Sequence, residues 1–223
     1  MINDHDKWDK VINFESLYCY PGTDILINKL GIKDKQLLEN VDRGFSTFKL
    51  SKVYLRKFTG NFDLEHYLSI HRYVFEDLYY FAGEIRNENI QKSGIPFCRP
   101  EFVGQYLEYT LLQMKKDLRK VVDENSLLDY LAYYYGEIDI IHPFREGNGR
   151  VQREFFRQYM EYVNSKLNIP NYTFEYSKWT KEDKKHLIEG CVASAKTGDK
   201  SILKQVLAKS LVQVDEKEHR KTR

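Results

Sequence analysis

The chain has 223 residues, 42% of them hydrophobic and 30% charged, a balance typical of a globular protein with a sizeable core and far from that of disordered or collagen-like chains. Its 35 basic and 33 acidic residues give a formal net charge of +2, too small for an electrostatic footprint on nucleic acid or an anionic membrane. We therefore expect one compact domain with no direct nucleic-acid or membrane partner, in which any anion binding is local.

The N-terminus and the cysteines give no sign of export. The first ten residues, MINDHDKWDK, are charged and hold no apolar leader, and no apolar run is long enough to span a bilayer. Cys19, Cys98 and Cys191 are widely spaced and form no CxxC pair, which argues against a disulfide framework and a zinc site. We expect a cytoplasmic protein, unless it is exported by a route that the sequence does not reveal.

Apolar residues recur at three- and four-residue spacing along most of the chain, which predicts an all-α protein. Caps are expected at two helix starts, from Ser126 with Asp129 and from Thr180 with Asp183. The predicted helices cover residues 61–82, 101–121, 126–141, 149–166, 180–196 and 200–213.

One stretch breaks the helical pattern. Residues 85–98 place apolar side chains on both sides of the turn signal Ser93-Gly94, which predicts a β-hairpin and the only strand pair of the chain. An isolated hairpin is marginal in water, and Pro96 cannot donate to a ladder. We expect this hairpin to be held by packing or by a partner strand.

The residues that carry chemistry are concentrated in 142–153, HPFREGNGRVQR, directly after an apolar helix. Pro143 disfavours the helical conformation for the residue before it, so the helix should stop and present the imidazole of His142 in a loop. An imidazole is substantially neutral at physiological pH and can accept a proton. His142 is therefore the candidate general base.

The middle of this segment is a candidate phosphate site. Gly147 and Gly149 can take positive φ at no steric cost, and with Asn148 between them they let successive amide N–H groups converge on an anion. A helix is predicted to begin just after them, so its positive dipole end and its unpaired N–H groups face the same spot.

Charged side chains flank the nest. Arg150, Arg153 and Arg157 share one helix face, and the first two are close enough to the loop to bind phosphate oxygens, whereas Arg157 is about two turns away. Glu146 supplies a carboxylate, the ligand type through which Mg²⁺ binds together with substrate phosphates. These residues predict a site for a metal-bound nucleotide.

Each feature alone has a plainer explanation. A histidine before proline is usually packed, a Glu-Gly-Asn-Gly sequence is usually a turn, and helix arginines usually pair with glutamates such as Glu154 or Glu161. Together, the base, the carboxylate, the anion nest and the guanidinium groups fall within twelve residues and are the parts needed for displacement at phosphorus.

The segment from His142 to Arg150, followed by Arg153, resembles the signature HPFx(D/E)GNGRxxR of the Fic (filamentation induced by cAMP) family without a departure. The sequences YPGT at 20–23, NKLG at 28–31 and FAG at 81–83 are also similar to Fic proteins. The resemblance covers residues 18–213 and leaves an N-terminal extension, 1–17, and a charged tail, 214–223. We expect the tail to be disordered.

The resemblance implies an all-helical Fic fold with the hairpin lying over the active site as a flap. It implies protein adenylyltransferase activity, in which His142 deprotonates a Ser, Thr or Tyr hydroxyl of a target, the hydroxyl attacks the α-phosphate of ATP, and Glu146 holds Mg²⁺. Phe144 is expected to pack inward and anchor the loop. The implied nucleotide ligands are Gly147, Asn148, Gly149, Arg150 and Arg153, with Lys92, Ser93 and Gly94 of the flap.

The resemblance also suggests partners. A target would pair with the flap at 85–98, and the family suggests gyrase or topoisomerase subunits, or the protein itself. Many Fic proteins are restrained by a helix of pattern (S/T)xxxE(G/N), and no glutamate of this chain fits that pattern. The enzyme is therefore expected either to be the toxin of a pair in which a small antitoxin supplies the helix in trans, or to lack this restraint. The glutamates tested are Glu39, Glu88, Glu124, Glu146 and Glu189.

Three alternatives stay open. A Fic enzyme could use another donor and transfer UMP, phosphocholine or phosphate, although Gly149 argues against the phosphate-transferring Doc-like branch. A module that binds nucleotide without catalysis would be expected to lack the base, the carboxylate or an arginine, and this sequence has all of them. A nucleic-acid-binding helical protein is suggested only by a pI of 8.2 and by Lys-rich stretches that are more simply solvated helix faces.

Overall fold

The computed structural model describes residues 10–11, 16–56, 60–92 and 94–214. These residues form seven α-helices and small antiparallel strand pairs, so the predicted all-α class is confirmed. The chain divides into two compact units, residues 1–108 with 141–151 and residues 109–140 with 152–223. Ser93 and the tail at 215–223, with its expected disorder, lie outside the described residues.

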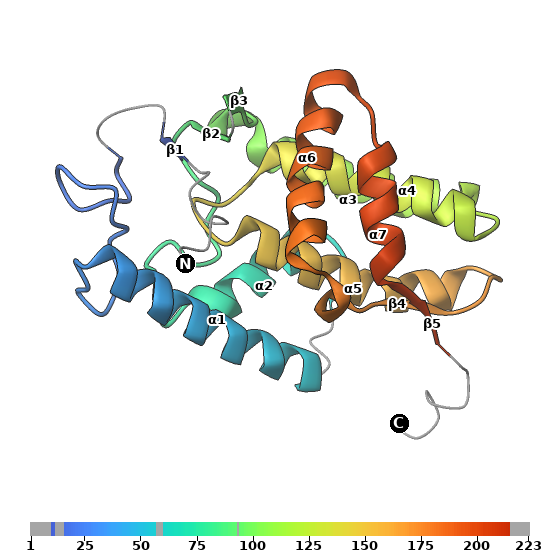
Figure 1. Cartoon of the computed structure of the whole chain (residues 1–223), viewed down its shortest axis with the longest axis horizontal. Coiled ribbons are helices and arrows are strands. Elements are labelled where there is room, and N and C mark those ends of the chain that lie inside the picture. The colour runs from blue at the N-terminus through green and yellow to red at the C-terminus, as the bar shows by residue number, and fades with distance from the viewer. Residues whose placement is uncertain (1–9, 12–15, 57–59, 93, 215–223) are drawn as a thin grey trace. The chain divides into compact units, whose positions relative to one another are not determined.

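In the first unit, α1 (Lys35–Arg56) packs against α2 (Leu64–Phe75) (Figure 1). The α2 helix begins where the Asp63 carboxylate accepts a hydrogen bond from the His66 amide at 3.0 Å. Its buried face carries Tyr67, Ile70 and Val74. The helix predicted over 61–82 exists but is shorter, because the chain turns after Phe75 toward a left-handed glycine at position 83 (φ +82°).

The α1 helix was not predicted because its apolar and polar residues do not separate onto two faces. Its buried side includes the polar residues Asp42 and Ser46, and its exposed side includes Leu37, Phe48 and Tyr54. A helix is recognised in sequence by an apolar stripe opposite a polar one, and neither stripe is clean here.

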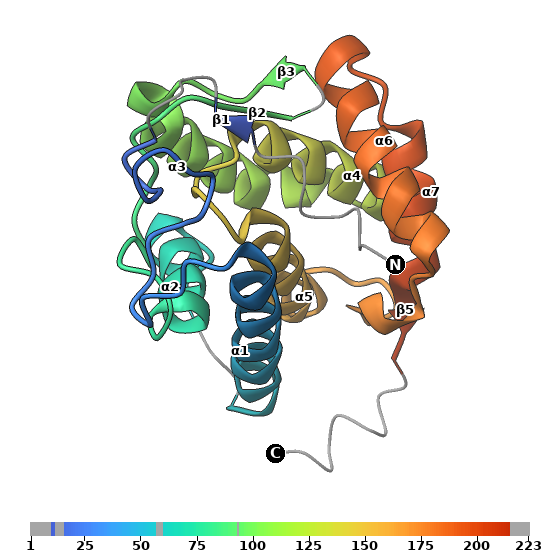
Figure 2. The same ribbon diagram turned by 60° about the vertical axis from the view of Figure 1, so that its left-hand side comes forward.

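The predicted hairpin is confirmed. The strands β2 (Ile90–Lys92) and β3 (Ile95–Pro96) are antiparallel, and the turn uses Gly94 at φ +75°. A third strand from the N-terminal extension, β1 (Lys10–Val11), pairs with the other edge of β2 (Figure 2). The hairpin therefore has a partner strand within the chain, and Ile90, 1% exposed, anchors it to the core.

The second unit holds the second half of α3 (Pro100–Asp117), most of α4 (Glu124–Ile141) and α5 (Asn148–Lys166), the pair α6 (Lys181–Thr197) and α7 (Ser201–Ser210), and two short 3₁₀ turns. Its core is aromatic, with the hydroxyls of Tyr130 and Tyr159 joined at 2.8 Å. None of the described helices is long and apolar enough to cross a bilayer. The 3₁₀ turns cover Leu118–Lys120 and Tyr176–Lys178.

Of the two predicted caps, one is confirmed and one is wrong. Thr180 and Asp183 form a reciprocal capping box at the start of α6. The α4 helix instead begins two residues earlier than predicted, because the Asp123 carboxylate accepts from the Ser126 amide at 2.7 Å and Ser126 Oγ accepts from the Asp123 amide at 3.0 Å.

The hairpin is not the only strand pair, contrary to prediction. A second antiparallel pair joins β4 (Tyr172–Phe174) to β5 (Leu211–Gln213) in the second unit. The helix predicted over 200–213 consequently ends at Ser210, and its last predicted residues form β5. This pairing joins segments nearly forty residues apart, which local periodicity does not reveal.

Candidate active site

The signature loop joins two helices. The α4 helix ends at Ile141 and α5 begins at Asn148, so the predicted end of the helix before His142 is confirmed. His142 itself has a left-handed backbone, φ +46°, which is unfavourable for a residue with a Cβ atom. The surroundings must therefore hold this conformation in place.

The ring of His142 stacks flat on Phe97, with centroids 3.8 Å apart and planes 11° from parallel. Phe97 follows β3, and its amide donates to the Ile90 carbonyl at 3.1 Å, so the stacking partner belongs to the root of the hairpin. His142 is 4% exposed. Stacking covers a face of the imidazole, whereas a base acts through a ring nitrogen at the edge.

Phe144, the expected anchor of the loop, packs inward. It is 0% exposed and stacks on His71, with centroids 3.7 Å apart and planes 15° from parallel. His71 comes from the buried face of α2; its Nδ1 accepts from the Gly83 amide at 2.7 Å, so its Nε2 carries the proton donated to the Glu146 carbonyl at 3.0 Å. Burial lowers the pKa of His71 to about 3, which keeps this structural imidazole neutral.

Gly147 alone provides the left-handed turn of the nest. Its φ is +86°, and a Cβ added here would lie 2.3 Å from the ring of Phe75, so glycine is required twice over. Gly149 does not adopt positive φ as the sequence suggested, because it already lies in the first turn of α5.

The helix start leaves two amides for an anion. The amides of Arg150 and Val151 both donate to the Gly147 carbonyl at 3.1 Å, so the groups that the loop can offer are the N–H groups of Asn148 and Gly149. The Asn148 side chain has another task, because it accepts from the Phe144 amide at 2.8 Å and donates to the Phe144 carbonyl at 2.7 Å. Asn148 can therefore serve an anion only through its backbone.

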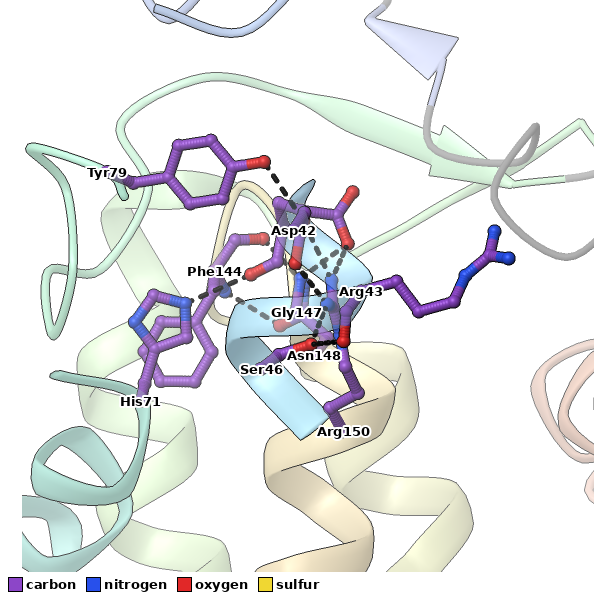
Figure 3. A network of polar contacts seen from close by, with 10 residues as sticks. Asp42, Arg43, Ser46, His71, Tyr79, Phe144, Gly147, Asn148 and Arg150 are labelled. Carbon is purple, nitrogen blue, oxygen red and sulfur yellow. Dashed lines mark hydrogen bonds and ion pairs between the residues drawn. The ribbon is translucent and has the colours of Figure 1, made fainter. Parts of the chain in front are cut away.

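Arg150 lies in a network of acidic and hydroxyl groups (Figure 3). Its guanidinium forms a bidentate ion pair with Asp42 of α1 and donates to Ser46 Oγ at 2.8 Å. It also pairs with Glu146 at 3.0 Å. The fork predicted to bind phosphate is thus held by carboxylates in this structure.

Tyr79 completes this network from the side of α2. Its hydroxyl donates to Asp42 Oδ2 at 2.9 Å. Burial and the negative charge of Asp42 raise the pKa of Tyr79 far above its ordinary value, so the hydroxyl stays a donor. With both an arginine and a tyrosine bound, Asp42 is a fixed support of Arg150.

Glu146 is the carboxylate available to a metal ion. Its Oε1 accepts from the Gly147 amide at 2.7 Å, and its side chain is 23% exposed. Within residues 10–11, 16–56, 60–92 and 94–214, no three ligating groups cluster as a self-sufficient metal site. One partly exposed carboxylate beside an anion nest fits Mg²⁺, which usually binds through one or two carboxylates together with substrate phosphates.

The remaining predicted residues fall elsewhere. Arg153 lies one turn beyond Arg150 on α5, in the second unit, within hydrogen-bonding range of Tyr135. Arg157 pairs with Glu154 at 2.6 Å, which agrees with its exclusion from the phosphate site. Of the flap candidates, Lys92 is the last residue of β2 and Gly94 lies in the turn that follows it. Ser93 between them lies outside the described residues.

Sequence reasoning missed four residues that support the loop: Asp42, His71, Tyr79 and Arg86. Asp42 and His71 had one detectable signal, since each is a polar side chain on the buried side of a helix, where a partner is required. Arg86 is a charged residue with 1% exposure beside the hairpin, and nothing local marks it.

A mostly helical fold, with this signature loop beside a β-hairpin, defines the Fic class of proteins. The chain belongs to the Fic/DOC family, whose model matches residues 61–160.

Two curated relatives and one solved structure illustrate the family. The chain is 35% identical to protein adenylyltransferase VbhT of Bartonella schoenbuchensis over 63% of this chain but only 30% of that protein. It is 30% identical to the probable protein adenylyltransferase y4lH of Sinorhizobium fredii, over 69% of this chain and 80% of that protein. The crystal structure of BepC from Bartonella tribocorum with bound AMPPNP shares the fold, with a TM-score of 0.74 at 21% identity over 89% of this chain and 97% of that one.

Proposed function

We propose that this chain is a protein adenylyltransferase, which transfers AMP from ATP to a Ser, Thr or Tyr hydroxyl of a target protein. The observation that supports the proposal is the His142 ring, stacked on Phe97 at the root of the hairpin, in the short loop that leads into the N-terminus of α5. The names of two relatives, protein adenylyltransferase VbhT and probable protein adenylyltransferase y4lH, support the same activity.

The proposed reaction is a displacement at phosphorus. The target hydroxyl oxygen attacks the α-phosphorus of ATP, a ring nitrogen of His142 accepts the hydroxyl proton, and the bond from the α-phosphorus to the bridging oxygen breaks to release pyrophosphate. The amides of Asn148 and Gly149, with the dipole of α5, stabilise charge on the phosphates. Arg150, and Arg153 by its place in the signature, supply positive charge.

Glu146 is the residue proposed to hold Mg²⁺. When bound, the ion would neutralise phosphate charge and assist the departure of pyrophosphate. The contact between Glu146 and the Arg150 guanidinium sets the direction of the carboxylate before a nucleotide arrives. Replacement of Glu146 by glutamine should therefore raise the Mg²⁺ concentration needed for half-maximal transfer.

We propose that the target pairs as a strand with the flap, and β1 supports this idea because it already pairs with the edge of β2. Gyrase or topoisomerase subunits, or a second copy of this chain, are candidate targets. Removal of residues 1–15 should increase target labelling without changing the KM for ATP, because it frees this edge; reduced labelling would contradict the pairing. We also propose restraint by a small antitoxin that acts in trans. Co-expression with small proteins encoded beside this one tests it, because such a partner should suppress target labelling.

The decisive experiment compares labelling of protein from ATP carrying ³²P at the α- or the γ-position, with Mg²⁺, alone and with bacterial lysate. His142→Ala should abolish α-label transfer but keep ATP binding, whereas His186→Ala, at an exposed histidine of α6, should change neither. Label from the γ-position would mean phosphate transfer. Labelling only from another donor, such as UTP, would replace AMP transfer with that reaction, and no labelling from any donor would favour a non-catalytic nucleotide-binding role.

A further inference from the structure

Arg86 is the largest fully buried side chain among the described residues, with 1% exposure. Arginine is rarely buried to this extent unless its donors are satisfied, because a buried charge is costly. The proposed chemistry assigns Arg86 no part, so its position calls for a physical reason.

The guanidinium of Arg86 donates to four backbone carbonyls. Nε donates to the carbonyl of His142 at 2.8 Å, and Nη2 donates to that of Ile141 at 3.3 Å. Nη1 donates to the Glu88 carbonyl at 2.6 Å, and Nη2 also donates to the Cys98 carbonyl. A planar fork with five donors suits this task, and the point charge of lysine does not.

These carbonyls belong to two segments, the flap and the end of α4 with His142, whose relative position the hydrogen bonds fix. Glu88 and Cys98 are the two roots of the flap, two residues before β2 and two residues after β3. Ile141 and His142 are the end of α4 and the base, whose carbonyls have no acceptor role left within the helix. The Arg86 amide adds a further link by donating to the carbonyl at position 143, at 2.9 Å.

The same contacts fix the ring of the base from two sides. One holds the His142 carbonyl while the residue keeps its left-handed φ of +46°. Another holds the carbonyl of Cys98, next to Phe97, on which the His142 ring stacks. Loss of the fork would free both the backbone of the base and the aromatic surface that orients it.

We propose that Arg86 is a positioning residue for His142: its guanidinium locks the base and both roots of the flap into one arrangement. The proposal rests on the proposed function only in calling His142 the base. A second contact between the flap and the loop provides a control. Arg145 Nε forms an ion pair with the Glu88 carboxylate at 2.7 Å, and this ion pair does not involve the carbonyls of residues 141, 142 or 98. If Arg86 only held the flap to the loop, loss of the Arg145–Glu88 ion pair would disturb the His142 ring as much as loss of the Arg86 contacts.

The first test is spectroscopic and needs no activity. The protein is labelled with ¹³C-histidine, and its six histidines are observed by NMR. The His142 signal is assigned as the one that disappears in His142→Ala. Stacking at 3.8 Å on an aromatic ring displaces the His142 ring protons upfield. Arg86→Lys should move this signal toward its position in Phe97→Leu, whereas Glu88→Gln should leave it in place, and an unchanged His71 signal reports an intact fold.

The second test is kinetic. Arg86→Lys should lower kcat for nucleotidyl transfer at least tenfold with little change in the KM for ATP, because misplacing a reacting group by about 1 Å can cost 10²-fold. A folded Arg86→Lys protein with an unmoved His142 signal, or with kcat within twofold of the parent, overturns the proposal.

If Arg86→Lys does not fold, Phe97→Leu tests the same arrangement from the other side, because it removes the stacking surface and leaves the fork intact. A folded Phe97→Leu protein should lose kcat and the upfield shift together. Retention of kcat within twofold in that variant would show that the arrangement fixed by Arg86 has no catalytic consequence. Failure to detect any transfer by the parent protein would refute the proposed function and leave the spectroscopic test of Arg86 to stand alone.

Discussion

Acidification should destabilise this protein through His71. Burial lowers the pKa of His71 from 6.5 to about 3; the hydrogen bond to the Glu146 carbonyl opposes this shift, and the charge of Arg150 adds to it. The unfolded chain takes up a proton at this residue below pH 6.5, whereas the native protein does not until about pH 3. The neutral His71 therefore costs the native protein no stability well above pH 6.5. The free energy of unfolding falls as the pH drops below 6.5, because only the unfolded chain takes up the proton.

The magnitude follows from the two pKa values. Between pH 7.5 and pH 5 this single group should lower the free energy of unfolding by about 2 kcal/mol. Between those limits the slope approaches about 1.4 kcal/mol per pH unit, the value for uptake of one proton on unfolding. The loss at pH 5 hardly changes if the native pKa is one unit higher, because both values lie below the pH of the measurement.

The assay is urea unfolding across this pH range, without nucleotide or Mg²⁺, for the parent and for His71→Gln. Glutamine can still donate to the Glu146 carbonyl but cannot be protonated, so the variant should be less stable at pH 7.5 and lose about 2 kcal/mol less on going to pH 5. His186→Gln controls for the loss of an exposed histidine. Parallel stability curves for the parent and His71→Gln would refute the reasoning.

Three further changes test the loop. Gly147→Ala should cost more stability than Gly31→Ala, because both need positive φ, worth about 1–2 kcal/mol, but only the first adds a Cβ that meets an aromatic ring; equal losses in urea unfolding would contradict the clash. Asp42→Asn should destabilise the fold by about 1–3 kcal/mol and tighten ATP binding, since Arg150 loses a carboxylate partner; weaker ATP binding by calorimetry would oppose this. Phe144→Ala should cost about 3–5 kcal/mol and Phe144→Leu under about 1.5 kcal/mol, measured by thermal and urea unfolding, and similar losses would argue against its anchoring role.

The elements that could be predicted are those whose signals are local. The helix before His142 ends because proline follows it, and α6 begins at a Thr180–Asp183 box that is complete within four residues. The hairpin is marked by a Ser-Gly turn between apolar residues, and the signature identifies the loop as a unit. In each case the determining contacts lie within a few residues of one another.

The left-handed backbone of His142 shows where local reasoning stops. The following proline excludes the helical conformation but does not choose the left-handed one. The carbonyl of this left-handed residue accepts from Arg86 Nε, 56 residues away along the chain, which no local pattern reveals. The pairing of Arg150 with Asp42 spans 108 residues and replaces the free guanidinium fork that the helix periodicity suggested.

The sequence by itself therefore determined the family, the candidate base and the order of the parts in the signature loop, because these are written in adjacent residues. Only the tertiary structure decided which groups hold those parts: His71 beneath Phe144, Asp42 on Arg150, and Arg86 between the flap and His142. The physical reason is that a buried polar group must find its partner in space, and the chain brings that partner from a distant element that no local pattern specifies.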